Sequence, residues 1–299
     1  MIKKRLFAVA FVLTLAASII LAGCSDISDK VAVTSDLPPA DLPPVKEAYP
    51  VGVGSEKFEA SPSTVASLSP AITQIISELG ADNKLIAVSD YCDYFKDGIE
   101  KIGSPALPDI DKIIELSPEL LITQSPIASA DVVRLKQAGV RTLYIGLPKS
   151  FSGLCEEYIN LALIFYGSID SKEVAVSALS GLDSIMTEIS KSGINTRFIA
   201  LGESVGDDVM AFGSDCLSGE MLSIYGENLL GDIKSGLISI DELSRLGPDT
   251  VFADESLKDE DIEDAFPDAR IIYCDMGSFE QPTVSLSGMM GYLKSELEK

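Results

Sequence analysis

The sequence predicts an α/β fold in which two lobes with central, mostly parallel sheets are bridged by one long α-helix. Strand-length apolar runs alternate with helical patterns from Thr64 onward, an order typical of parallel sheets covered by helices. The bridging helix is predicted over residues 170–193, where apolar residues recur at a spacing of three and four. Asp170 followed by Glu173 fits a capping box, and Ser192-Gly193 fits a C-terminal stop. At about 1.5 Å per residue, such a helix spans roughly 30 Å.

An internal repeat lies on either side of this helix. Residues 109–124 read DIDKIIELSPELLITQ and residues 239–254 read SIDELSRLGPDTVFAD, at a constant offset of 239 − 109 = 130 residues. Each copy is a short helix, a Pro break and a strand. Two similarly built lobes explain the repeat, and a chance likeness of helix-Pro-strand units is the alternative. The matched pairs are Ile110 and Ile240, Asp111 and Asp241, Leu116 and Leu246, Pro118 and Pro248, and Glu119 and Asp249.

The alternation also predicts the order of the remaining elements. The strands are expected at 64–68, 85–88, 141–145, 197–201, 209–212 and 269–274, and the helices at 71–79, 130–138, 151–166, 217–225 and 283–297. The predicted division of the chain is a signal peptide (1–23), a lipidated Cys with a disordered tether (24–60), an N-terminal lobe (61–152), a helical connector (153–193) and a C-terminal lobe (194–299). The tether is inferred from repeated Pro among polar residues.

The N-terminus has the pattern of an export signal. Lys3, Lys4 and Arg5 precede 16 largely apolar residues, 6–21, and Leu-Ala-Gly-Cys ends at Cys24. The pattern resembles the bacterial lipoprotein signal, which implies cleavage before Cys24 and lipidation of its thiol. The alternative, an uncleaved anchor, has fewer than the roughly 20 apolar residues of a typical span. We therefore expect an extracytoplasmic protein that is lipid-anchored to the cell membrane.

Composition excludes several classes of function. The formal charge is −23, and loss of the three signal-peptide cations leaves 20 − 46 = −26. So acidic a chain repels nucleic acid and anionic lipid headgroups. There is no His, which removes the usual zinc ligands and the base of Ser-His-Asp and Cys-His hydrolases. We expect no enzyme, no metal site and no cofactor; the remote alternative is an extracellular enzyme that uses paired carboxylates.

Four cysteines remain after Cys24, and they lack CxxC spacing. Disulfides are compatible with an extracytoplasmic location, and four Cys allow three complete pairings. Isolated buried thiols are the alternative. The residues are Cys92, Cys155, Cys216 and Cys274.

Ligands of open parallel sheets bind outside the carboxyl ends of the strands, so the loops there are the candidate site. In the first lobe these loops are 69–70, 89–95, 124–126 and 146–150, and in the second they are 202–208, 213–215, 254–256 and 275–282. They carry aromatic side chains that suit a large flat ligand. The second-lobe loops carry many carboxylates and hardly a cation. The predicted ligand-binding residues are Ser69, Pro70, Tyr91, Tyr94, Gln124, Ser125, Phe212 and Phe279.

Two segments carry a resemblance to a known family. VASLSPAITQIISELGADNKLIAVSDYCDYF and KIGSPALPDIDKIIELSPELLIT resemble the solute-binding lipoproteins of ABC importers for cobalamin, haem and ferric siderophores, over about residues 62–299. The Tyr91-Cys92-Asp93-Tyr94 segment is most similar to members assigned to cobalamin. The resemblance implies two bridged lobes, a monomer, and an ABC permease with its ATPase as partners. A receptor that binds ligand without delivering it is a further alternative.

The resemblance also implies docking carboxylates near the tip of each lobe. Family members place a Glu there against Arg residues of the permease, and the matching positions are Asp111 and Asp241. Asp is one methylene shorter than Glu, and Glu242 is a substitute in the second lobe. The alternative role of a carboxylate in a first helical turn is to stabilise the helix dipole.

Among the ligands of that family, cobalamin fits the acidic loops best. Ferric catecholates and haem propionates favour Arg in the site, whereas cobalamin is close to neutral and carries peripheral amides. Haem remains the alternative, because Tyr91 or Tyr94 is able to ligate iron without His. Ordinary packing is the alternative role of each single aromatic residue.

Overall fold

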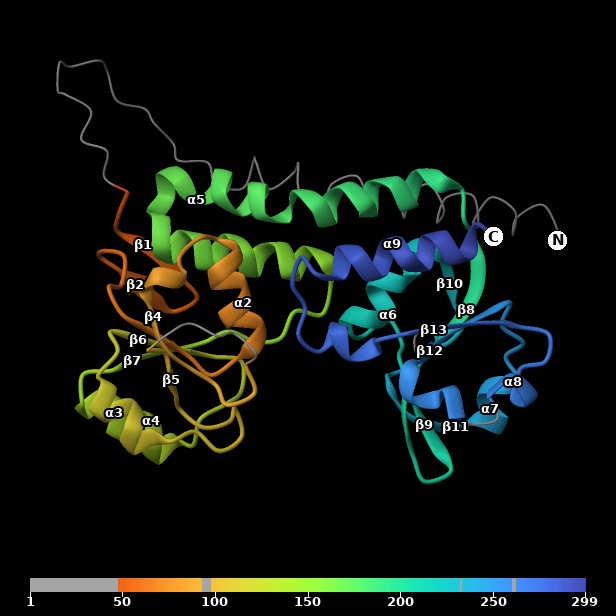
Figure 1. Cartoon of the computed structure of the whole chain (residues 1–299), viewed down its shortest axis with the longest axis horizontal. Coiled ribbons are helices and arrows are strands. Elements are labelled where there is room, and N and C mark those ends of the chain that lie inside the picture. The colour runs from red at the N-terminus through yellow and green to blue at the C-terminus, as the bar shows by residue number, and fades with distance from the viewer. Residues whose placement is uncertain (1–47, 93–97, 232, 260–261) are drawn as a thin grey trace, which may run out of the picture. The chain divides into compact units, whose positions relative to one another are not determined.

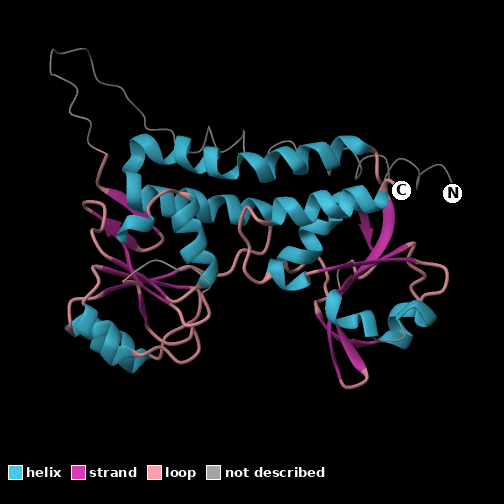
Figure 2. Ribbon diagram, viewed as in Figure 1, coloured by secondary structure: helices cyan, strands magenta, loops and turns pink. Residues whose placement is uncertain are grey.

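The computed structural model describes residues 48–92, 98–231, 233–259 and 262–299. Within these residues the chain forms a five-stranded and a six-stranded sheet, each with its own helices, and both lobes contact the long helix α5 (Phe151–Ser192) (Figures 1 and 2). The predicted α/β class with two lobes and one bridging helix is therefore confirmed. The signal peptide, Cys24 and the tether up to residue 47 lie outside the described residues.

The sheet of the first lobe is wholly parallel, in the order β5-β4-β3-β6-β7. Ala66 and Leu121, from neighbouring strands, pack with Ile113 and Leu135 of two helices in one buried cluster. The strands are β3 (Val65–Ser67), β4 (Leu85–Val88), β5 (Glu100–Lys101), β6 (Leu120–Thr123) and β7 (Arg141–Tyr144). The helices are α2 (Pro70–Glu78), η2 (Asp82–Lys84), α3 (Ile110–Leu116) and α4 (Ser129–Gln137).

The sheet of the second lobe is mixed, because β9 and β11 run antiparallel to their neighbours. Its order is β11-β9-β8-β12-β13, with β10 also paired to β8. The strands are β8 (Thr196–Val205), β9 (Asp208–Ala211), β10 (Gly226–Asn228), β11 (Gly236–Ser239), β12 (Thr250–Asp254) and β13 (Arg270–Cys274). The helices are α6 (Leu217–Leu222), η3 (Ser223–Tyr225), α7 (Ile240–Ser244), η4 (Glu255–Asp259), α8 (Ile262–Ala265), η5 (Met276–Phe279) and α9 (Leu286–Leu297).

The internal repeat corresponds to equivalent structure in the two lobes. Asp109 caps α3 by accepting the Lys112 N–H, and Ser239 caps α7 by accepting the Glu242 N–H. Each copy continues into the strand that pairs in parallel with the first strand of its lobe, β6 with β3 and β12 with β8. The repeat therefore records two lobes built on the same unit.

The acidic residue after the repeat's Pro also has the same role twice. Glu119 Oε2 accepts the Ser63 N–H at 2.7 Å, just before β3. Asp249 Oδ2 accepts the Arg197 N–H at 3.3 Å, near the start of β8. In both lobes this carboxylate satisfies a backbone donor beside the paired strands, which favours the observed register.

Helix α5 is longer than predicted and is interrupted at Gly167, whose φ is 70° and ψ is −174°. Its second segment resumes immediately after Gly167, so the predicted start at Asp170 is wrong. The C=O of Ala48 accepts the Ser168 N–H at 2.8 Å and so caps this segment in place of a side chain. The predicted stop is confirmed, because Gly193 adopts the left-handed conformation with φ 76°.

The end of the predicted tether is folded, which corrects its boundary at residue 60. A hairpin of β1 (Val51–Val53) and β2 (Glu56–Phe58) packs against α5. The Tyr49 hydroxyl donates to the C=O of Ile164 at 2.8 Å, and Phe58 is fully buried. Strands of three residues are too short to show a periodic pattern, so the Pro and Gly around them dominated the prediction.

Substituting Gly167 is expected to destabilise the protein by about 2–4 kcal/mol. A Cβ there would lie 2.7 Å from the Ala48 Cβ, and closer still to its carbonyl oxygen, in a left-handed backbone conformation. Urea unfolding of Gly167→Ala measures the loss. Gly181→Ala is the matched control, because nothing lies within 4 Å of its Cβ; it should be stabilising by about 0.5–1 kcal/mol. Equal effects of the two substitutions would contradict the steric argument.

Candidate functional site

Ser69 and Gln124 lie together at the carboxyl ends of β3 and β6. Ser69 caps α2, where Pro70 occupies the first turn, and it is only 5% exposed. Its hydroxyl donates to Gln124 Oε1, and Gln124 Nε2 donates to Glu157 Oε1 at 2.8 Å. This hydrogen-bond chain joins the two strand ends to α5, so both predicted residues belong to a fixed polar layer at the edge of the sheet.

Glu157 is the buried end of that chain. It is 3% exposed, and its second oxygen, Oε2, has no hydrogen-bond partner among the described residues. Burial raises the pKa of Glu157 to about 8, although the hydrogen bond from Gln124 acts in the opposite direction. The carboxyl group is therefore largely neutral at pH 7.

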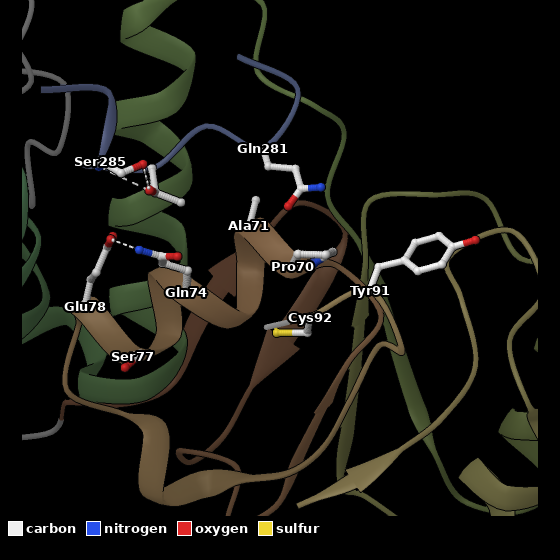
Figure 3. A pocket seen from close by; sticks show the side chains of 10 residues that line it. Pro70, Ala71, Gln74, Ser77, Glu78, Tyr91, Cys92, Gln281 and Ser285 are labelled. Atoms are coloured by element: carbon white, nitrogen blue, oxygen red, sulfur yellow. Dashed lines mark hydrogen bonds between the residues drawn. The ribbon is translucent and has the colours of Figure 1, made fainter. Parts of the chain in front are cut away.

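A cavity of about 520 Å³ lies between α2, the turn at Tyr91 and Cys92, and the segment that precedes α9 (Figure 3). This volume is within the range of roughly 300–1,000 Å³ typical of small-molecule sites. Its lining residues come from both lobes: Pro70, Ala71, Gln74, Ser77, Glu78, Tyr91 and Cys92 from the first, and Gln281, Thr283 and Ser285 from the second.

The lining is polar and lacks positive charge. Carboxylate, amide and hydroxyl groups predominate, and none of the lining residues in the described part of the chain is Lys or Arg. Tyr91, 66% exposed, contributes an aromatic ring. The nearby ammonium group of Lys101 is directed at backbone, bonding the C=O of Ser89 at 3.2 Å and of Cys92 at 2.6 Å. Such a lining offers many acceptors and hydroxyls to a ligand, but no cation from those residues.

Several predicted ligand-binding residues do not line this cavity. Phe279 is buried, at 7% exposed, whereas Phe212 is half-buried with its ring close to Gly202. The backbone C=O of Ser125 accepts a hydrogen bond from the Thr123 hydroxyl at 2.8 Å. Tyr94 lies outside the described residues. Of the eight predicted residues, Pro70 and Tyr91 line the cavity.

One predicted loop has a different structure. Residues 202–208 were expected to form a loop at the carboxyl edge of the sheet, but β8 continues to Val205 and pairs with Asp208 of β9 in a hairpin. Because β8 and β9 are antiparallel, this hairpin differs from the loops that follow the parallel strands of the sheet. The apolar run 197–201 does not mark where β8 ends.

The residues missed by the sequence analysis have recognisable signals. Gln74, Ser77 and Glu78 follow Pro70 by four, seven and eight residues, which places them on one face of α2. Thr283 and Ser285 were assigned to the last helix, which begins only at Leu286. The loop before this helix is therefore longer than predicted, and its additional residues complete the cavity.

The proposed docking positions are exposed but differ in their surroundings. Asp111 in α3 forms an ion pair with Arg134 of α4, and Arg134 also contacts Asp131 at 3.3 Å. For Asp241 in α7, the described residues contain no ion-pair partner. In Figure 1, α3 and α7 lie on the side of their lobes that faces away from α5. A surface pair such as Asp111 with Arg134 contributes only about 0–1 kcal/mol, so a stronger external partner is able to replace it.

The structure places no disulfide between the described cysteines: Cys92, Cys155 and Cys274 are buried, and Cys216 is partly buried. This arrangement matches the alternative to disulfide pairing. No group of three or more Cys, Asp or Glu suited to a metal ion occurs among the described residues. Nor does the part of the chain that the structure describes contain a helix long and apolar enough to cross a membrane.

Comparisons with known proteins agree with this architecture. A family model described as periplasmic binding protein matches residues 65–264. An uncharacterized ABC transporter substrate-binding lipoprotein of Bacillus subtilis, YvrC, is 28% identical over 267 residues, covering 83% of this chain and 81% of that protein. A vitamin B12-binding protein of Vibrio parahaemolyticus is 34% identical over 99 residues, which is 32% of this chain and 34% of that protein.

A solved structure extends the comparison to the fold. The periplasmic haem-binding protein HutB of Vibrio cholerae superposes with a TM-score of 0.68 at 17% identity, covering 79% of this chain and 99% of that chain. At this identity the likeness concerns the fold alone. It agrees with the two lobes and bridging helix described above.

Proposed function

The chain belongs to the periplasmic binding protein family, whose members bind solutes for ABC importers without catalysing a reaction, and from this premise we propose that its ligand is a corrinoid of the cobalamin type. The observation that carries the proposal is the lining of the inter-lobe cavity. That lining combines a carboxylate, amides and hydroxyls, with no Lys or Arg among the described lining residues.

The charge of the cavity separates the candidate ligands. Ferric catecholates and haem carry negative charge, which proteins usually recognise with Arg or Lys. Cobalamin is close to neutral and carries peripheral amides that donate hydrogen bonds to carboxylate and carbonyl oxygens. A cavity of 520 Å³ accommodates one edge of so large a molecule. The partial match to a vitamin B12-binding protein supports the same ligand class.

The mechanism is capture in a largely preformed site. Both lobes are hydrogen-bonded to the first part of α5: the Tyr158 hydroxyl donates to Glu78 and accepts the Val284 N–H at 2.9 Å. Phe151 is the first residue of α5, and its N–H donates to the carboxylate of Glu220 in α6 at 3.0 Å. These shared contacts restrict the relative motion of the lobes to a small rocking, so binding requires little ordering.

Delivery follows from the rest of the proposal. Lipidation at Cys24 keeps the protein at the membrane, where it acts as a monomer. Asp111 and Asp241 bind cationic residues of the permease. The exposed position of both carboxylates on separate lobes supports this role. The ATPase of the importer then drives release into the cell.

Haem is the second candidate, and one observation favours it. Tyr91 places an exposed phenol at the cavity, and a tyrosinate is able to ligate ferric iron in a protein without His. The fold shared with the haem-binding protein HutB supports haem as the second candidate.

Calorimetric titration of residues 25–299 with cyanocobalamin, haem and a ferric catecholate tests the proposal. We expect a submicromolar Kd for cyanocobalamin and binding at least 10-fold weaker for the two anionic ligands. Tighter binding of haem, with the absorption band of an iron tyrosinate, would establish the second candidate instead. Binding of none of the three would refute the proposed ligand class.

A further inference from the structure

One end of the cavity holds a carboxylate in a fixed position. Gln74, Glu78 and Ser285 gather at this end, whereas Tyr91 lies at the other (Figure 3). Gln74 Nε2 donates to Glu78 Oε1 at 3.1 Å, and the Tyr158 hydroxyl donates to Glu78 Oε2. Each carboxylate oxygen therefore has a neutral donor that determines its orientation.

Tyr158 is a permanent donor in this arrangement. It is fully buried, and burial raises the pKa of its phenol well above the usual range; the negative charge of Glu78 adds to this effect. The Tyr158 oxygen also accepts the Val284 N–H from the second lobe. The carboxylate is thus held by a side chain that both lobes contact.

The charge of Glu78 is not neutralised by the protein around it. Its two donors are uncharged, and none of the described Lys or Arg residues forms an ion pair with it. Each oxygen has about two acceptor sites, so one donor apiece leaves capacity for a ligand. The partial burial of Glu78 strengthens the attraction of its carboxylate for donors and its repulsion of anions, relative to a fully exposed carboxylate.

We propose that Glu78 is the specificity-determining residue of this cavity, binding an amide- or ammonium-bearing arm of the ligand and rejecting ligands that present a carboxylate there. The inference rests on the proposed function, because it assigns this arm to a neutral corrinoid periphery. Gln74, Ser77 and Ser285 supply further polar groups around the same arm. The cavity would therefore bind less tightly those ligands that carry a carboxylate in place of this amide, including haem with its propionates.

The test is a binding cycle between the protein and matched ligands. Wild-type protein and Glu78→Gln are titrated with cyanocobalamin and with its three monocarboxylic acids, in which one peripheral propionamide is hydrolysed. We expect one monoacid to bind the wild type about 10-fold more weakly than cyanocobalamin, and this difference to disappear in Glu78→Gln. Haem should bind Glu78→Gln more tightly than the wild type.

Two controls separate the possible causes. Glu156→Gln makes the same change of charge on the exposed face of α5, close to Tyr158 in sequence, and should leave every affinity unchanged. Thermal unfolding of Glu78→Gln establishes that it is folded, and an amide at this position is still able to accept the Tyr158 hydroxyl. If Glu78→Gln and Glu156→Gln changed the affinities equally, the effect would come from the overall electrostatic field of the protein, and the proposal would be overturned.

The outcomes also separate this inference from the proposed function. If the wild type binds cyanocobalamin but no monoacid is discriminated, the assignment of Glu78 is overturned and the proposed function stands. If the wild type binds haem instead, the proposed function fails, and unchanged haem affinity in Glu78→Gln overturns the inference as well. Tighter haem binding by that variant would support it. Binding of no ligand refutes both.

Discussion

Uptake of the ligand by intact cells is expected to be abolished when both lobe tips carry Asp111→Arg and Asp241→Arg, while the Kd of the purified protein for ligand stays unchanged. Both residues lie outside the cavity, on helices α3 and α7. Close charge pairs across interfaces show coupling energies of about 1.5–7 kcal/mol, so converting two attractions into repulsions weakens docking by at least roughly 100-fold. Parallel uptake and calorimetric measurements check the prediction.

The neighbourhood of Asp111 supplies a sharper version of this experiment. Under the proposed docking, Arg134 competes with the permease for the Asp111 carboxylate, so Arg134→Gln should preserve or increase uptake by a few-fold. Glu173→Arg with Glu188→Arg, two exposed residues of α5, reverses the same number of charges away from both lobe tips and should preserve uptake. A loss of ligand affinity in the Asp111 and Asp241 variant as large as its loss of uptake would refute docking.

The fold was predictable because its signals are local. Apolar runs, Gly and Pro breaks and the repeat at 109–124 and 239–254 each depend on a few neighbouring residues. The structure adds a reason for the repeat, since Glu119 and Asp249 both accept a backbone N–H beside the adjacent strand. The hairpin 51–58 was missed because its stability comes from α5, more than 100 residues away in the sequence.

The site was only partly predictable, because it depends on which segments meet. Pro70 and Tyr91 were identified from their positions after strands, and both line the cavity. Phe279 satisfies the same sequence criterion but is buried, and sequence does not distinguish an aromatic ring in a pocket from one in a core. Phe212 also satisfies it, but it is half-buried beside Gly202 and does not line the cavity. Glu78 lies on a face of α2 that becomes significant only where the second lobe covers it.

Glu157 is an extreme case, since a Glu in a long helix is ordinarily exposed. The structure buries it, and burial raises its pKa from 4.5 to about 8. Between these values the folded protein retains a proton that the unfolded chain releases. The contribution of Glu157 to the free energy of unfolding therefore falls as pH rises through this window, by about 1.4 kcal/mol per pH unit. The contribution of Glu157 to stability is fully present below pH 4.5 and is lost completely above about pH 8.

Glu157→Gln should remove this pH dependence, because an amide keeps the bond from Gln124 and has no proton to lose. In urea unfolding at pH 5.5, 6.5 and 7.5, the free energy of unfolding of the variant should rise relative to that of the wild type by about 1.4 kcal/mol per pH unit. Because the chain contains no His, no imidazole titrates in this pH window. Burial also raises the pKa of Glu220, but that contribution is common to both proteins and cancels in the difference. Glu156→Gln, on the exposed face next to it, should follow the wild type. Parallel curves for Glu157→Gln and the wild type would show instead that the folded protein accommodates a charged carboxylate at position 157.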